Sequence, residues 1–374
     1  MKKILAILLV LVLVGISVIS SVKSVTNPFS ECAELFIKSH QEAITSLRGA
    51  ELASPMVYKD KDGKDRVIVY GVKKGEEIIG RIVVNYDREN PIVLEFAEAV
   101  PPHLLDVQEE IFNKTSLEKN MAFGNPEFIY VFPLLYYVHF KVYDKNQAVE
   151  DVYFFWNEKR IVTLTDIPDF PILVNDKFPL MEQATSESYK ILYDVPDYTT
   201  YTNSLCNNCG PVAGANILGY WHKHGYYYLQ HDWDESDGNG LITCLWYDMN
   251  TSCIYGTPAS NFRSGIVYHA NTVHDDYLGI YHFSTSGNSY PEFSDAVSEI
   301  NAGRPFGILI HQNIFIWHWI TCIGYDSGYD SQYGNYICVR DGEGDGIVYI
   351  NWYNPYLKSR SISIDGFNYV YPSY

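Results

Sequence analysis

The fold is decided by the stretch Cys209-Gly-Pro-Val-Ala-Gly-Ala-Asn-Ile-Leu-Gly-Tyr-Trp-His-Lys-His224. Its apolar residues recur at spacings of three and four, which predicts an amphipathic helix over residues 212–224. Pro211 suits the first turn of this helix, and Gly225 suits the position after its last turn. Cys209 then lies at the N-terminal end, where the positive end of the helix dipole stabilises a thiolate. We therefore expect Cys209 to be a nucleophile.

A second stretch, Trp317-His-Trp-Ile-Thr-Cys-Ile-Gly-Tyr-Asp326, supplies a candidate base. It has the composition of a strand, and residues 336–341 are expected to pair back against it across a turn. The hairpin carries His318 and Asp341. If these two residues face each other, the Asp341 carboxylate orients the imidazole through its second ring nitrogen.

The hairpin also contains two cysteines, and its register predicts whether they can form a disulfide. In the register that places His318 opposite Asp341, Cys322 and Cys338 point to opposite faces of the sheet. They are therefore not expected to form a disulfide.

The two motifs Cys209-Gly-Pro-Val-Ala213 and His318-Trp-Ile-Thr-Cys-Ile-Gly-Tyr-Asp326 resemble those of C39-like peptidases on a papain-like fold. The resemblance covers roughly residues 201–353. It implies that Cys209 attacks a carbonyl carbon, that His318 accepts and returns the proton, and that Asp341 orients His318. Family members also carry a glutamine about six residues before the nucleophile, which helps to bind the oxyanion, and this chain has Asn203 there.

Other interpretations of the same residues remain open. Cys206 and Cys209 form a C-x-x-C pair, which is also typical of a redox pair or a structural disulfide, and either would remove the nucleophile. Asn351 competes with Asp341 for the orienting role, because an amide can also hold an imidazole.

Metal sites are not favoured by the spacing. Cys206, Cys209, His222 and His224 come near a zinc-finger pattern, but the two histidines are too close together to share one helical face. The segment 341–346 imitates the start of a calcium loop, yet Trp352 stands where the bidentate glutamate belongs. The acidic segment 232–237 is typical of a solvated loop. No metal and no cofactor is expected.

The N-terminal part of the chain has a different character. Residues 1–24 combine Lys2 and Lys3 with an apolar run, which predicts an export signal or a retained N-terminal anchor. An amphipathic helix is expected from Cys32 to Leu47, followed by short strands at residues 67–70, 78–84, 92–96, 128–131, 136–143 and 152–156.

This part also has its own resemblance. The segments Ser54-Pro-Met-Val-Tyr58, Gly80-Arg-Ile-Val-Val-Asn85 and Pro91-Ile-Val-Leu-Glu-Phe96 are similar to streptopain-type propeptides. The resemblance implies a segment that shields a cleft until it is removed. We expect an α+β protein with a pro- or inhibitory domain at residues 25–180, a linker at 181–200 and a papain-like catalytic domain at 201–374.

Composition limits the possible partners. The net charge of −18 opposes binding to nucleic acid or to anionic lipid, which are held by clustered Lys and Arg. An odd count of 7 cysteines leaves at least one thiol unpaired within the chain.

These features together predict a secreted cysteine peptidase precursor, whose partners are a peptide or protein substrate and its own pro-domain. The alternatives are a secreted peptide-binding module without activity, or an acyl or amide transferase with the same residues. Activation is expected from a cut between about Asp194 and Ser204.

Overall fold

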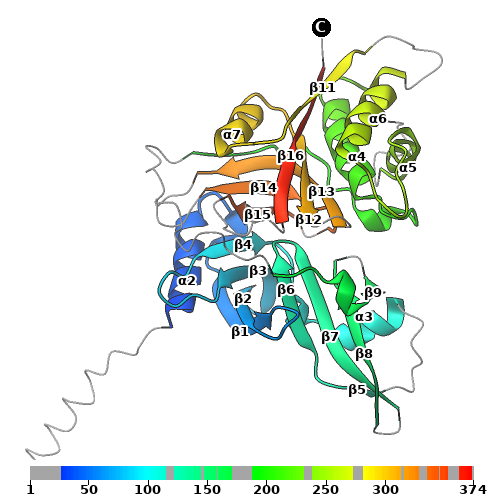
Figure 1. Ribbon diagram of the computed structural model, residues 1–374. Helices are drawn as coiled ribbons and strands as arrows, with labels where there is room; N and C mark the ends of the chain where they lie inside the picture. Colours follow the sequence, from blue (N-terminus) through cyan, green and yellow to red (C-terminus); the bar gives the residue numbers. More distant parts are fainter. Residues whose placement is uncertain are drawn as a thin grey trace, which may run out of the picture.

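The computed structural model describes most of the chain as helices and strands around one extended sheet (Figure 1). The predicted export signal, residues 1–24, lies outside the described residues. The ranges that the structure describes are 27–114, 122–144, 147–157, 159–170, 188–230, 238–272, 281–312, 316–327, 335–344, 346–352 and 362–372. We call residues 27–170 the N-terminal region and residues 188–372 the C-terminal region.

Helices and strands alternate irregularly along the chain, which is the mark of an α+β protein. The α-helices are α2 (Pro28–His40), α3 (Val107–Lys114), α4 (Cys209–Lys223), α5 (Asn239–Asp248), α6 (Ala259–Thr272) and α7 (Phe293–Asn301). The strands of the N-terminal region are β1 (Glu51–Lys59), β2 (Asp65–Lys74), β3 (Glu77–Asn85), β4 (Val93–Ala97), β5 (Ala122–Phe123), β6 (Glu127–Phe132), β7 (Leu135–Asp144), β8 (Gln147–Phe155) and β9 (Arg160–Val162). Those of the C-terminal region are β10 (Tyr189–Ile191), β11 (Phe283–Asn288), β12 (Phe306–Gln312), β13 (Ile316–Asp326), β14 (Tyr336–Arg340), β15 (Val348–Asn351) and β16 (Ile362–Pro372).

One sheet runs through both regions in the order β11-β16-β12-β13-β14-β15-β4-β3-β2-β1-β6-β7-β8-β9. The pairing is antiparallel except between β1 and β6, which are parallel. The two regions join where β15 pairs with β4, at the middle of Figure 1. The sheet is therefore continuous across the boundary that the sequence places between two domains.

Local sequence signals explain much of this structure. Asn27 caps α2 by accepting the Phe29 N–H at 3.2 Å, and Pro28 occupies the first helical position. The strands expected in the N-terminal region correspond to β2, β3, β4, β6, β7 and β8. In the C-terminal region, the helix expected at residues 212–224 is α4.

The segment just before α4 is packed against the C-terminal region. β10 pairs with β13, so that Lys190 lies opposite Tyr325. Val195 and Tyr198 are buried, and the Tyr198 N–H donates to Asn216 Oδ1 in α4 at 2.9 Å. The described part of the expected linker, residues 188–200, is therefore packed against the C-terminal region and does not behave as a loose linker.

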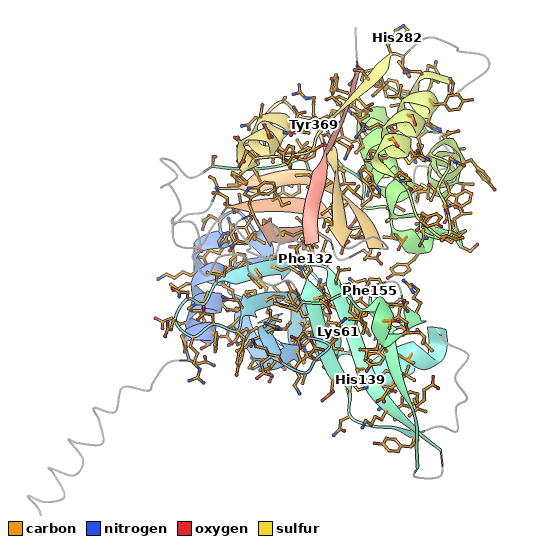
Figure 2. All side chains as sticks on the ribbon, in the orientation of Figure 1. Lys61, Phe132, His139, Phe155, His282 and Tyr369 are labelled. Carbon is orange, nitrogen blue, oxygen red and sulfur yellow. A yellow bond between two sulfur atoms is a disulfide. The ribbon has the colours of Figure 1, made fainter. Side chains whose placement is uncertain are left out.

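Apolar side chains cover both faces of the sheet. One core cluster packs Tyr58 and Phe132 of the N-terminal region together with Ile308 and Ile320 of the C-terminal region. Figure 2 shows Phe132 close to the boundary between the regions. The other face carries a second cluster, which also draws on both regions.

Helices α4, α5 and α6 form a layer beside β12 and β13 with a core of its own. No helix among the described residues is long and apolar enough to cross a membrane.

Candidate active site

Helix α4 places Cys209 at its first position. The preceding residue, Asn208, makes no side-chain cap hydrogen bond, and the Val212 N–H donates to its carbonyl at 2.9 Å. Nearly the whole helix is buried, from Gly210 to Tyr220. Cys209 is therefore held at the N-terminus of a rigid buried helix, as the sequence predicts.

Gly210 allows a close approach at this helix end. A Cβ atom at Gly210 would lie 2.5 Å from Thr257 Oγ1 and 2.7 Å from Thr257 Cβ. Thr257 in turn shares a hydrogen bond of 2.8 Å with Thr251. Only glycine fits beside Thr257, so the segment before α6 lies directly against the start of α4.

Strand β13 carries His318 to the same place. Thr321 on β13 donates from Oγ1 to the Ala213 carbonyl of α4 at 3.2 Å, which fixes the strand along the helix. The neighbour of His318, Trp319, is buried and stacks on Phe262 with ring centroids 4.0 Å apart. Its indole N–H donates to the Thr257 carbonyl at 2.7 Å. Thr257 thus connects the histidine strand to the cysteine helix.

Cys209 and His318 line one pocket with a volume of about 510 Å³. The pocket opens between segments that are distant in the sequence. Its lining also includes Thr200, Tyr201, Leu205, Cys206, Asn207, Asn208, Cys253, Ile254, Tyr255, Gly256 and Glu343 of the C-terminal region, and Arg160 of the N-terminal region. The expected nucleophile and base therefore meet in a concave site, where catalytic residues are usually found.

The His318 ring is oriented by the main chain of Asp341. A ring N–H donates to the Asp341 carbonyl, and this hydrogen bond favours the protonated ring. Burial opposes it more strongly and lowers the pKa of His318 to about 4. Although the ring borders the pocket, its surroundings hold it neutral at physiological pH, as a general base requires.

Asp341 lies just beyond the end of β14, and the strand register differs from the expected one. Thr321 pairs with Arg340, so Asp341 is not directly opposite His318. The Asp341 carboxylate is buried and accepts the Glu343 N–H at 2.9 Å. The residue reaches His318 through its carbonyl, while its carboxylate closes the turn that follows.

Cysteine pairing leaves Cys209, the expected nucleophile, as a thiol. Cys206 forms a disulfide with Cys253, whereas Cys209 belongs to no disulfide and is partly exposed. The alternative of a Cys206–Cys209 disulfide or redox pair is therefore wrong, because Cys206 is already bonded to another residue. The same bond removes Cys206 as a zinc ligand.

The other thiols differ from Cys209 in exposure. Cys32, Cys322 and Cys338 are buried, whereas Cys244 is exposed on α5. Burial raises the pKa of Cys32 and Cys322 to about 12 and also raises the pKa of Cys338. The expectation that Cys322 and Cys338 do not pair is confirmed, since both are free thiols.

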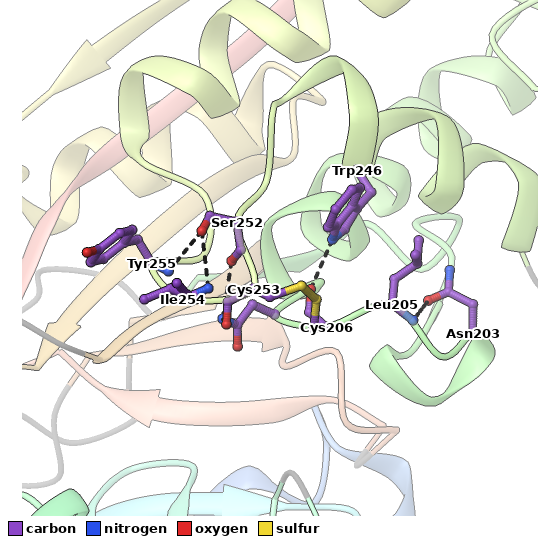
Figure 3. Close-up of a disulfide and its surroundings, with 9 residues drawn as sticks. Asn203, Leu205, Cys206, Trp246, Ser252, Cys253, Ile254 and Tyr255 are labelled. Atoms are coloured by element: carbon purple, nitrogen blue, oxygen red, sulfur yellow. Dashed lines mark hydrogen bonds between the residues drawn. A yellow bond between two sulfur atoms is a disulfide. The ribbon is translucent and has the colours of Figure 1, made fainter.

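The Cys206–Cys253 disulfide, drawn in Figure 3, anchors a loop that lines the same pocket as Cys209. Trp246 Nε1 donates to the Cys206 carbonyl at 2.9 Å. Asn207 Nδ2 donates to the carbonyls of Ser252 and Cys253 at 3.2 and 2.7 Å. Loop residues 252–256 are therefore fixed at one wall of the pocket.

Asn203, the candidate oxyanion residue, is engaged next to the pocket. Its Oδ1 accepts the Leu205 N–H at 3.1 Å and Asn208 Nδ2 at 3.0 Å. Asn208 Nδ2 also donates to the Thr200 carbonyl at 3.0 Å. Asn203 does not occur among the residues that line the pocket. In this arrangement it supports the segment before Cys209, and its oxyanion role stays a prediction.

The remaining candidates lie elsewhere. Asn351 is buried on β15, where its Nδ2 donates to the Val93 carbonyl of the N-terminal region at 3.0 Å. Among the described residues, no group of three or more His, Cys, Asp or Glu is arranged to hold a metal ion. The acidic segment 232–237 lies outside the described residues, so its interpretation stays a prediction.

A comparison with protein families agrees with this geometry. Residues 176–353 match the Peptidase_C39 like family. This stretch of the chain is similar to that family. The match contains both motifs, Cys209-Gly-Pro and the β13 strand with His318. No curated protein and no solved structure matches the chain.

Several residues of this C39-like site could not be predicted from any sequence pattern. Thr257, Tyr201 and Glu343 join it only through tertiary contacts. The run of three small or breaking residues Gly256-Thr-Pro258 marks a turn but does not indicate that Thr257 contacts α4.

Proposed function

We propose that the protein is a cysteine peptidase that hydrolyses peptide bonds, with Cys209 as nucleophile and His318 as general base. The observation that carries the proposal is the shared pocket, which is lined by a thiol outside any disulfide at a helix N-terminus and by a neutral imidazole. The match of residues 176–353 to the Peptidase_C39 like family supports it.

The reaction follows from the placement of these groups. His318 takes the thiol proton of Cys209, and the sulfur attacks the carbonyl carbon of the scissile amide. His318 then delivers that proton to the leaving amine, so that a thioester remains. Water, deprotonated by His318, releases the acid and restores the thiol. The Asp341 carbonyl keeps the imidazole in place throughout.

The oxyanion is proposed to bind at the start of α4. Main-chain N–H groups of a first helical turn point outward and carry positive partial charge, and Cys209 provides one of them. Asn203 remains the proposed second donor, which requires its amide group to turn away from Asn208.

The N-terminal region is proposed to restrict the pocket in the intact chain, as in a zymogen. Arg160 lines the pocket, and Tyr201, also a lining residue, donates its hydroxyl to the Asn157 carbonyl. The turn between β8 and β9 therefore contacts the pocket rim. Residues 1–24 support export of this precursor from the cell, either free or held by an N-terminal anchor.

Thiol labelling tests the catalytic pair. Folded protein carrying Cys244→Ser, which removes the exposed thiol of α5, is treated with an iodoacetamide probe from pH 4 to 9. We expect one fast-reacting thiol at Cys209 that slows strongly in His318→Ala. The buried thiols Cys32, Cys322 and Cys338 serve as internal slow controls.

Peptide cleavage is then measured with the same variants on an unbiased peptide mixture by mass spectrometry. Activity that is lost in Cys209→Ala and in His318→Ala supports hydrolysis. Slow, uniform labelling without cleavage would favour the non-catalytic binding module. Products extended by an added amine in place of water would identify a transferase with the same residues.

A further inference from the structure

Among the described residues, two of the contacts between the N-terminal and C-terminal regions can be compared. One is the pocket rim at Arg160 and Asn157. The other, which we call the junction, consists of β4 and α2 on one side and β13, β14 and β15 on the other. The two contacts differ in character, because Arg160 and Tyr201 are exposed at the rim although Asn157 is buried, whereas the junction is buried.

Main-chain hydrogen bonding crosses the junction. In β15, Val348, Tyr349 and Ile350 pair with Ala97, Phe96 and Glu95 of β4. β4 pairs with β3 on its other side. Separation of the regions would turn β4 and β15 into edge strands with unpaired N–H and C=O groups, which is a costly and aggregation-prone arrangement.

Side chains on one face of the junction are buried as well. Phe36 of α2 packs edge-on against Tyr336 of β14, with ring centroids 5.5 Å apart. His40 Nε2 lies 3.8 Å from the carboxylate of Asp326, and all four residues are buried. Tyr336 also donates its hydroxyl to the Val93 carbonyl at 3.3 Å.

The N-terminal side of the junction is itself rigid. Glu95 of β4 accepts Arg81 Nε at 3.0 Å, the Tyr136 hydroxyl at 2.6 Å and the Leu134 N–H at 3.0 Å. Arg81 and Glu95 are almost completely buried. This network fixes β4 next to β3, and so presents a preformed strand to β15.

We propose that the N-terminal region is a permanent part of the folded protein and stays bound after any cut between the two regions. Access to the pocket then depends on movement of the turn at Arg160, and not on loss of the region as a whole. This inference goes beyond the proposed peptidase activity, because it concerns the processed form of the chain. It also differs from the removable propeptide that the sequence leads one to expect.

A cut chain tests the proposal. A recognition sequence for a site-specific protease is placed between Phe170 and Ser188 in full-length protein with Cys209→Ala, so that self-digestion cannot interfere. After complete cleavage, size-exclusion chromatography is run without denaturant at about 1 µM and again at about 10 nM. We expect both fragments in one peak with the elution volume of the uncut chain.

A pair of variants links the result to the junction. Asn351→Ala removes the side-chain hydrogen bond to the Val93 carbonyl, and Asn271→Ala removes a similar bond to the Phe283 carbonyl far from the junction. In the cut protein, we expect Asn351→Ala to weaken association at least about tenfold and Asn271→Ala to leave it unchanged. Fragments that separate without denaturant, or equal effects of the two substitutions, would overturn the proposal. Neither readout depends on peptidase activity.

Discussion

His318 is a half-buried histidine whose charge state links stability to pH. Its pKa is lowered from 6.5 to about 4 by burial, so the unfolded chain binds more protons than the folded one between these values. Stability is therefore full above pH 6.5 and falls as the pH drops through this window. The loss should be on the order of 2 kcal/mol, after a discount for solvent at the pocket side.

The measurement is urea unfolding at pH 7 and at pH 4.5 for the wild type and for His318→Gln. His40 and His103 also have lowered pKa values because of burial, so both proteins lose stability in acid. The difference between them isolates His318. Equal losses in the two proteins would show that the histidine titrates normally.

Asp341 offers a second test at the same scale. Because its carbonyl holds His318 and its carboxylate accepts the Glu343 N–H, Asp341→Asn keeps both hydrogen bonds. We expect kcat/KM for peptide cleavage to fall by less than about tenfold. A carboxylate that directly supports the imidazole would give a loss nearer 10⁴-fold. The ratio of the two rates decides which part of Asp341 acts.

The sequence identifies Asp341 but not the atom that acts, for a physical reason. Strand patterns place a residue near its neighbour, whereas the side-chain direction depends on register, and β13 and β14 shift register between Cys322 and Gly324. A similar limit applies to Asn203. Its position before Cys209 can be seen in the sequence, but its contacts with Leu205 and Asn208 cannot.

At the scale of elements, the packing of helix α4 against the segment before α6 can be tested. Gly210→Ala would press a methyl group onto Thr257, whose backbone and hydrogen bonds hold it in place. We expect a loss of about 1–3 kcal/mol, because the packed site cannot expand. Gly214→Ala in the same helix is the control, since its new Cβ meets the flexible end of Met249 at 2.7 Å. Thermal unfolding should rank Gly210→Ala well below Gly214→Ala.

The disulfide makes a prediction for the loop that borders the pocket. It joins residues separated by 47 positions, and a loop of this length gives about 4 kcal/mol in the chain-entropy limit. Cys206→Ser with Cys253→Ser should lower the free energy of unfolding by up to this amount, measured by urea unfolding. Iodoacetamide labelling of Cys209 at neutral pH should persist, because Cys209 belongs to α4. If the free energy of unfolding did not change, the disulfide would add nothing to the stability of the loop, and the hydrogen bonds of Asn207 would be enough to hold it.

Elements with strong local patterns were predictable, and those that depend on distant partners were not. α4 and β13 follow from apolar spacing and from Pro211 and Gly225. The Cys206–Cys253 bond was not predictable, because cysteine positions alone do not determine connectivity. β10 has too few residues for a pattern and exists only because β13 offers it an edge.

At the scale of the whole molecule, the shared sheet predicts coupled unfolding. Ile308→Ala on β12 removes a fully buried side chain of the C-terminal region and should cost about 2–5 kcal/mol. We expect hydrogen exchange of main-chain amides to accelerate on β3 as well as on β13. Acceleration limited to the C-terminal region would show that the two regions open independently.

The sequence indicated two domains because its motifs and resemblances divide near residue 180. The local sequence of β4 and of β15 does not predict that the two strands pair, since each is a short apolar run. Interpretation of the sequence therefore located the site, while the connection between the regions required the structure.

The pairing of β4 with β15 also has a consequence for the order of folding. Glu95 and Ile350 are partners although they stand 255 positions apart in the chain. Contacts of such long range form slowly, because the intervening chain must lose much of its freedom first. The hairpins β2–β3 and β3–β4 are local, so we expect them to assemble before the last strands emerge from synthesis. We therefore expect the N-terminal region to serve as the template on which Cys209 and His318 are finally brought together.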